Sequence, residues 1–164
     1  MPRSDAVPWL DDEERAAWFS FMSVLTALPG ALDAQLRRDA GLSHFDYQIL
    51  AALSMTKAPR MPMSAIAEAT ETSLSRLSHA CKRLEAKGWL RRHPDPNDGR
   101  VTLAELTDAG YAKVAGAAAG HVRTVRALVF DPLTKAQIKQ LAQITGRVSA
   151  ALGGPKPALR DLRS

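Results

Sequence analysis

The sequence predicts a mostly α-helical protein with a small β-hairpin near its middle. Apolar residues recur at helical spacing over most of the chain, which is typical of amphipathic helices. Residues 89–106 instead form two short runs separated by a turn rich in proline, aspartate and glycine, which is typical of a hairpin. Aromatic residues make up only 5% of the 164 residues, so we expect a core of Leu, Ala, Val and Ile. The length fits one medium domain, or a small domain with an oligomerisation part.

The first predicted element is a long helix over residues 11–40, ended by Gly41. Acidic residues at 11–14 stand where a helix N-terminus favours negative charge. Apolar residues recur at spacings near three and four, which indicates a seam for another helix: Trp18, Phe21, Leu25, Leu28, Leu32 and Leu36. Pro29, followed by glycine, is expected to kink or split this helix. Residues 1–10 are predicted to be a flexible N-terminus.

A helix, a loop and a second short helix follow. Ser43 is expected to cap a helix that ends near Met55. Residues 57–62 contain two prolines and are predicted to form a loop. Ser64 is expected to cap a short helix that ends at Ala69.

The next predicted helix, residues 72–87, is stopped by Gly88, which suits a left-handed C-terminal cap. One narrow face carries apolar residues and is expected to be buried: Leu74, Leu77, Cys81 and Leu84. The other side carries cations and hydroxyls but no carboxylate: Ser75, Arg76, His79, Lys82 and Arg83, with Thr72 and Ser73 near the start. Two helices joined by a tight turn are the helix-turn-helix pattern, with this helix as the recognition helix.

The hairpin follows without a linker. Residues 89–93 and 100–106 are the predicted strands, and residues 94–99 form the turn, where proline presets φ and glycine accepts positive φ. From Arg76 to Arg100 the chain holds seven bases and three acids. A helix that fits a groove beside a basic β-ribbon is the winged helix-turn-helix arrangement for duplex DNA, which we assign to residues 41–106.

Two further helices follow the hairpin. Thr107 is expected to cap a long helix that breaks at residues 131–132, and Thr134 to cap a final one. The winged helix-turn-helix core does not need these helices or the first one. We therefore expect residues 11–40 and 107–152 to be dimerisation helices that flank the core and pack across a two-fold axis onto a second copy. The alternative is a monomeric helical cap.

The charge is unevenly distributed. The net charge is +5 and the pI is about 9.7, which favours a polyanionic partner, with simple solubility as the alternative. Residues 1–40 hold four bases and seven acids, whereas residues 121–164 hold eight bases and two acids. We therefore expect the N-terminal part to stay off DNA and residues 153–164 to form a flexible basic tail.

Several function classes have little support. The lone Cys81 excludes an intrachain disulfide and is expected to be a core residue, with a redox-sensing thiol as the alternative. The four histidines are scattered, and no metal-ligand, nucleophile or phosphate-loop motif is present, so we expect no enzyme activity, cofactor, metal or catalytic residue. No apolar run approaches the ~20 residues that span a bilayer, and no signal peptide precedes the first helix, which predicts a cytoplasmic protein without a membrane partner.

The order of elements and three short motifs resemble the MarR family of bacterial transcriptional regulators. The motifs are residues 83–90 (RLEAKGWL), residues 98–100 (DGR) and residues 106–110 (LTDAG). They look like the family's R-L-E-x-x-G, D-x-R and L-T-x-x-G landmarks at the expected separations. The resemblance covers about residues 12–152 and implies a sequence-specific, double-stranded DNA-binding regulator, a ligand-responsive repressor acting as a homodimer. The alternative function is a winged-helix module that binds protein.

The resemblance also implies residue roles. The recognition helix would enter the major groove through Ser73, Ser75, Arg76 and His79. Arg100 at the wing tip would reach the minor groove, with Asp98 holding it in place. Lys82 and Arg83 would meet phosphates; the alternative for Arg76, Lys82 and Arg83 is a solvated face with an internal Arg83 salt bridge.

Two positions depart from the family pattern. Glu71 stands where glycine is common in the turn, and His79 where arginine is common, so turn geometry and base preference can differ. Family members often bind small aromatic or anionic effectors between the DNA lobe and the dimer helices. If that holds here, the candidate lining residues are Trp18, Phe21, His44 and Phe45, with core packing as their alternative.

Overall fold

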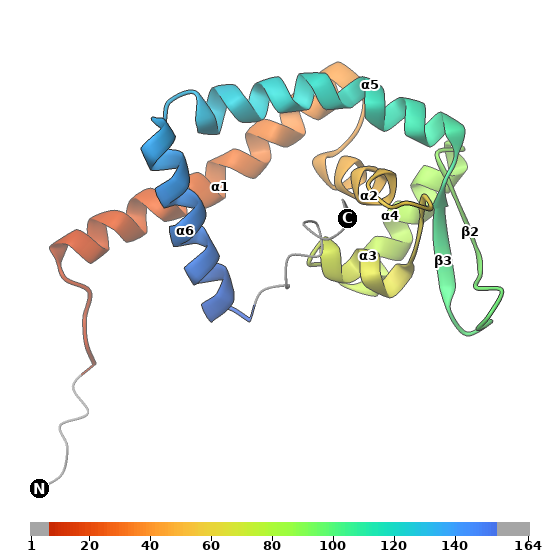
Figure 1. Cartoon of the computed structure of the whole chain (residues 1–164), viewed down its shortest axis with the longest axis horizontal. Coiled ribbons are helices and arrows are strands. Elements are labelled where there is room, and N and C mark those ends of the chain that lie inside the picture. Colours follow the sequence, from red (N-terminus) through yellow and green to blue (C-terminus); the bar gives the residue numbers. More distant parts are fainter. Residues whose placement is uncertain (1–6, 154–164) are drawn as a thin grey trace, which may run out of the picture.

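The elements follow one another in nearly the order that the sequence predicts (Figure 1). A computed structural model describes residues 7–153, so the predictions for residues 1–6 and for the basic tail after residue 153 lie outside the described residues. The elements are α1 (Asp12–Ala40), α2 (His44–Ser54), β1 (Arg60–Pro62), α3 (Met63–Ala69), α4 (Leu74–Ala86), β2 (Leu90–Pro94), β3 (Thr102–Leu106), α5 (Asp108–Val125), the π-helical turn η1 (Arg126–Phe130) and α6 (Lys135–Ala151).

Helix α1 begins and ends where its caps require. The Asp11 carboxylate accepts from the Glu14 backbone N–H at 2.8 Å, and Glu14 returns the contact in a capping box. Gly41 ends the helix in the left-handed region, at φ +62°. The helix continues through Pro29, so the split that the sequence allowed is wrong. One missing N–H removes a single hydrogen bond, which a helix of 29 residues tolerates.

Helix α1 carries a longer apolar stretch than expected from the sequence. Residues 16–32 carry no charge, and by length and composition alone α1 is long and apolar enough to cross a membrane. The expectation that no apolar run approaches that length was therefore wrong. Little of this stretch is buried within the chain, and an apolar helix of this kind also serves as a packing face for a partner.

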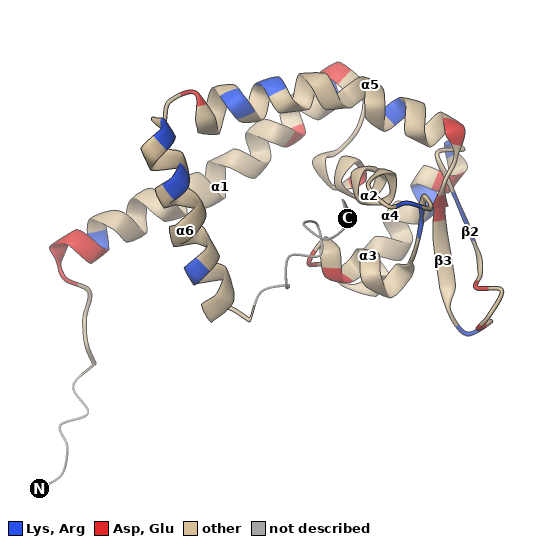
Figure 2. Ribbon diagram, in the orientation of Figure 1, with Lys and Arg blue, Asp and Glu red and all other residues tan. Residues whose placement is uncertain are grey.

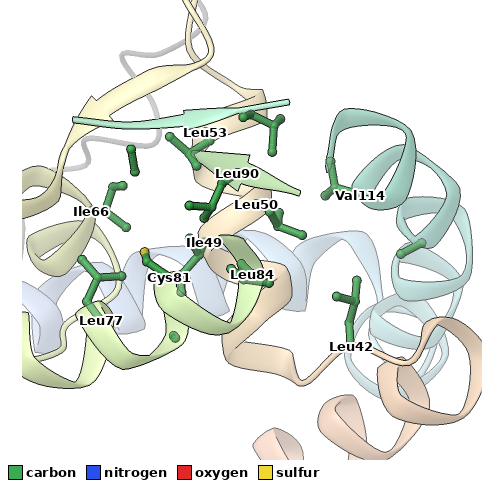
Figure 3. Packing of buried hydrophobic residues seen from close by; sticks show 14 of the residues in the cluster. Leu42, Ile49, Leu50, Leu53, Ile66, Leu77, Cys81, Leu84, Leu90 and Val114 are labelled. Atoms are coloured by element: carbon green, nitrogen blue, oxygen red, sulfur yellow. The ribbon is translucent and has the colours of Figure 1, made fainter. Parts of the chain in front are cut away.

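The core lies where α2, α3 and α4 meet the sheet and the start of α5 (Figure 3). Leu77, Cys81 and Leu84 of α4 are fully buried, as predicted. Leu74 was expected on the same buried face but is 55% exposed, because it is the first residue of α4 and lies one turn ahead of Leu77, the first buried position. Among the described residues, the fully buried leucines and isoleucines are Leu36, Leu42, Ile49, Leu50, Leu53, Ile66, Leu77, Leu84 and Leu90.

The hairpin is part of a three-stranded antiparallel sheet with the order β1-β3-β2. The sequence predicted a loop over residues 57–62, whereas β1 pairs with β3, Arg60 opposite Glu105 and Pro62 opposite Leu103. The prolines made this strand hard to predict. Proline is tolerated on an edge strand, but it weakens the sequence pattern that indicates a strand. Pro62 also occupies the N-cap of α3 without a side-chain bond, so the expected Ser64 cap is wrong.

The last helices start at their predicted caps. The Thr107 hydroxyl accepts from the Gly110 N–H at 3.0 Å, and Thr134 forms a capping box with Gln137. Helix α5 packs along α1, and α6 turns back from its far end (Figure 1). We call residues 12–31, η1 and α6 the arm. None of the arm residues is buried, in contrast with the winged helix-turn-helix core.

Candidate nucleic-acid interface

The outer face of α4 is polar and cationic, as predicted. Ser73 is the N-cap, and its hydroxyl accepts from the Arg76 backbone N–H at 3.3 Å. The inner face is fixed by its four buried side chains, so the opposite face must point outward. The exposed residues on it include all six candidates from this segment: Ser73, Ser75, Arg76, His79, Lys82 and Arg83.

Glu85 is the one carboxylate within α4, and the wing neutralises it. It accepts from the Arg92 backbone N–H at 2.9 Å and from the Arg92 guanidinium at 2.8 and 3.2 Å. These hydrogen bonds hold the pKa of Glu85 below its usual value. The contact ties β2 to α4, so the helix and the wing form one rigid surface whose exposed charge is positive.

The wing tip presents Arg100 to solvent, with 92% of its side chain exposed. Asp98 accepts from the Arg100 backbone N–H at 3.1 Å and from its guanidinium at 3.1 and 3.2 Å. The same bonds lower the pKa of Asp98. Asp98 thus holds Arg100 in the way the motif implied. Figure 2 also shows basic residues in the first part of β2 and an acidic residue between them and the tip.

Glu71 has an unusual conformation in the turn between α3 and α4. Its φ is +48°, the only positive value among the described non-glycine residues. A side chain in this region costs about 1 kcal/mol or more, which explains why glycine suits the position. Glu71 therefore replaces the glycine that is common at this position, while the backbone of the turn keeps its left-handed conformation.

The C-terminal end of α1 and the outer face of α4 line one hollow, which the sequence did not predict. A hollow of about 560 Å³ brings Arg37 of α1 next to Arg76 and Arg83 of α4. Arg83 donates to Asp46 of α2 at 3.1 Å, so the internal salt bridge considered for it is present, while 57% of its side chain stays exposed. The pair Arg37-Arg38 in the last turn of α1 was the one signal that could have indicated this.

Phe45 packs against the core, as its alternative interpretation expected. It lines the same hollow, and the Arg76 guanidinium lies over its ring at 4.9 Å from the centroid. Phe45 therefore supports a candidate DNA-contacting side chain through a cation–π contact.

The four candidate effector residues are not brought together. Phe21 faces the end of α6 across a hollow of about 510 Å³, His44 lines one of about 220 Å³ with Tyr47 and His121, and Phe45 lies under α4. Trp18 is about half exposed on the arm. His44 and Phe45 are consecutive in α2 and so point to different sides of the helix, which the grouping in the sequence overlooked.

His44 and His121 approach one another although they are far apart in the sequence. Their ring centroids are 5.8 Å apart, and Tyr47 lies 4.5 Å from His121. Burial lowers the pKa of both histidines, so both favour the neutral form. Over residues 7–153 no group of three or more side chains could hold a metal ion.

Cys81 is buried, and burial raises the pKa of its thiol to about 11. The thiolate is the reactive form, so the structure favours the core role over a redox role.

Comparisons with known proteins identify the MarR family. The MarR family model matches residues 40–101. A MarR family transcriptional regulator from Streptomyces coelicolor, Sco3205, solved in complex with DNA, is 42% identical; the match covers 92% of this chain and 97% of that one, with a TM-score of 0.85. AbsC, another MarR family regulator from Streptomyces coelicolor, is 35% identical over 90% and 99% of the two chains, also at 0.85. The transcriptional regulator PecS of Dickeya dadantii is 34% identical over 68% of this chain and 67% of its own length.

Proposed function

This chain belongs to the MarR family of transcriptional regulators and is a winged helix-turn-helix DNA-binding regulator, and on that premise we propose that it acts as a homodimer reading two half-sites on duplex DNA. The observation that supports this most is the pairing of two surfaces on one chain. One is the cationic face of α4 beside the Arg100 tip, and the other is an arm that buries none of its apolar residues. The first surface fits DNA and the second fits another copy.

The residue roles follow from where each side chain lies. Helix α4 enters the major groove, where Ser73, Ser75, Arg76 and His79 reach base edges and neighbouring backbone. Lys82 and Arg83 lie further along the helix and meet phosphates. Arg100, held by Asp98, reaches the minor groove.

The arm supplies the dimer contact. Large apolar side chains on it are exposed to an extent that a soluble single chain rarely shows: Trp18 49%, Phe19 64%, Val24 55%, Leu25 50%, Ile144 60% and Val148 39%. A hollow of about 460 Å³ between α1, η1 and α6, lined almost wholly by aliphatic residues, continues this surface. A two-fold axis through the arm buries both copies of the patch at once and places two α4 helices on one duplex.

We also propose that the regulator is a repressor whose affinity for DNA changes when it binds a small aromatic or anionic effector. The hollow beside His44, Tyr47 and His121 supports this, because it lies where α2 and α3 of the core meet α5. A regulator of this kind works on the chromosome, which in a bacterium places it in the cytoplasm. The alternative, a module that binds protein, requires an apolar exposed helix face, and the outer face of α4 is cationic.

The test is selection of bound fragments from the genome of the source organism, followed by titration of the selected duplex. We expect a site with two related halves, and an affinity that falls steeply with salt. Arg100→Ala should weaken binding about tenfold or more. Arg38→Ala removes an exposed arginine that pairs with Asp39, outside the arm and outside the hollow beside α4, and should leave binding unchanged. Equal effects of the two variants, or no DNA binding even in dilute buffer, would contradict the proposal. Titration of phenolic ligands, followed by Trp fluorescence and DNA release, tests the effector.

A further inference from the structure

We propose that Arg37, at the C-terminal end of the dimerisation helix α1, binds a phosphate of the DNA backbone in a hollow that it shares with Arg76 and Arg83. This inference rests on the proposed function and deepens it. The hollow holds about 560 Å³ and is lined by α1, by the start of α2 and by α4. It includes Ser73, Ser75 and His79, so any ligand in it lies directly beside the face that enters the groove.

Arg37 is fixed on one side and free on the other. Its Nε donates to Asp33 Oδ2 at 2.6 Å, and Asp33 Oδ1 accepts from the His44 backbone N–H at 2.8 Å. Asp33 is therefore held by α1 and α2 together and positions the guanidinium. The two terminal nitrogens of Arg37 have no hydrogen-bond partner within residues 7–153, and 64% of the side chain is exposed.

Arg76 and Arg83 are each also contacted by the protein on one side and open to a ligand on the other. Asp46, itself nearly buried, accepts one bond from Arg83, and the Phe45 ring supports Arg76 from beneath. Each guanidinium keeps several N–H donors for a ligand. Three guanidinium groups face two carboxylates, so the hollow is net positive, and guanidinium binds phosphate oxygens through paired hydrogen bonds.

The arrangement favours DNA phosphate as the occupant over a free anion. A recognition helix in the major groove is flanked by backbone phosphates, and this hollow runs along α4 from its N-cap Ser73 to Arg83. Free phosphate could accept the same hydrogen bonds in the absence of DNA. The experiment must therefore distinguish binding of free phosphate from binding of a DNA phosphate. The expectation from charge that the N-terminal part of the chain stays off DNA would then hold for most of α1 but not for its last turn.

The experiment compares Arg37→Gln with Arg38→Gln in the full chain. Arg38 is the adjacent arginine, is equally exposed and pairs with Asp39, but does not line the hollow. Binding to the selected duplex and to an unrelated duplex is measured across a series of salt concentrations. For Arg37→Gln we expect the salt slope to fall by about 0.9 per half-site, a loss of roughly fivefold to tenfold per half-site near 0.1 M salt. The preference for the selected duplex should stay the same, and Arg37→Lys should keep most of the slope.

The outcomes separate this inference from the proposed function. If the wild-type chain binds DNA and Arg37→Gln behaves as Arg38→Gln does, the inference is overturned while the proposed function stands. If the wild-type chain binds no DNA, both fail. A calorimetric titration with inorganic phosphate supplies the second arm. Loss of phosphate binding in Arg37→Gln without any change in the DNA salt slope would assign the hollow to a free anion and overturn the proposal. Sedimentation of each variant confirms that its assembly is unchanged.

Discussion

Helices α4 and α6 have similar local construction and opposite surroundings. Both are capped by a hydroxyl side chain, Ser73 for α4 and Thr134 for α6, and both carry apolar residues at helical spacing. Helix α4 buries four residues in the core of its own chain, whereas α6 buries none. The apolar periodicity thus predicts that a helix needs a partner surface, but it does not say whether that surface comes from the same chain.

The difference also separates two kinds of function. The core around α4 is buried within one chain, where Leu36 of α1 and Val114 of α5 contribute to it, so the outer face of α4 can be rigid, charged and specific. The arm is incomplete without another surface, so its role is to set the spacing between two such faces.

Truncation of a buried side chain in α4 should lower the stability of the fold, whereas truncation of an exposed side chain in α6 should weaken the dimer. Leu84→Ala removes a fully buried side chain and should lower the free energy of unfolding by about 3–4 kcal/mol at any protein concentration. Ile144→Ala, at a position 60% exposed in the single chain, should instead raise the dimer dissociation constant about tenfold. Chemical denaturation and sedimentation at several concentrations measure the two. A concentration-independent loss of similar size in both variants would contradict the division.

Gly110 marks the place where the start of α5 packs against the core. A Cβ at this position would lie 1.9 Å from the Trp89 carbonyl oxygen, so Gly110→Ala should cost about 2–3 kcal/mol. Gly116 in the same helix has nothing within 4 Å of its added Cβ. Gly116→Ala should therefore stabilise by about 0.5–1 kcal/mol. Thermal unfolding compares them, and equal behaviour would show that α5 does not pack on Trp89 as described.

Glu71 offers a smaller test within the helix-turn-helix. Its φ of +48° favours glycine, so Glu71→Gly should raise the free energy of unfolding by up to about 1 kcal/mol. Glu71→Ala removes the same charge but keeps the strain, and should give no such gain. If the alanine variant is stabilised as much as the glycine variant, the effect comes from charge and not from the backbone.

The smallest expected effect is a pH dependence of the link between wing and α4. Arg92 holds the pKa of Glu85 below its usual 4.5. A depressed folded-state pKa means that the contact contributes fully above pH 4.5 and is lost as the pH falls through the lower folded value. Protection of the Arg92 amide from hydrogen exchange should decrease in that range. The Glu85→Gln variant should lack this change, and its persistence there would assign it to another group.

Local features of the fold were predictable from the sequence, and long-range ones were less so. Ser43, Ser73, Thr107 and Thr134 were identified as caps or stood at predicted helix starts, because a cap depends only on the next three residues. Strand β1 was missed because its pairing with β3 is a contact over more than forty residues, and its prolines weaken the local pattern.

The candidate site likewise has features that the sequence predicts and features that depend on long-range packing. The outward face of α4 and the Asp98–Arg100 contact follow from helical period and a short motif. The place of Arg37 beside Arg83, and the support of Arg76 by Phe45, depend on how α1 and α2 pack against α4. Spacing within one helix carries no information about that packing.

Two copies of this chain are expected to join through their arms and to present two α4 helices to one duplex. Native mass spectrometry of the chain with its selected duplex measures how many chains bind. We expect a complex of two chains on one duplex, formed from a free dimer. A complex of one chain per duplex, with the free protein monomeric at micromolar concentration, would contradict this expectation.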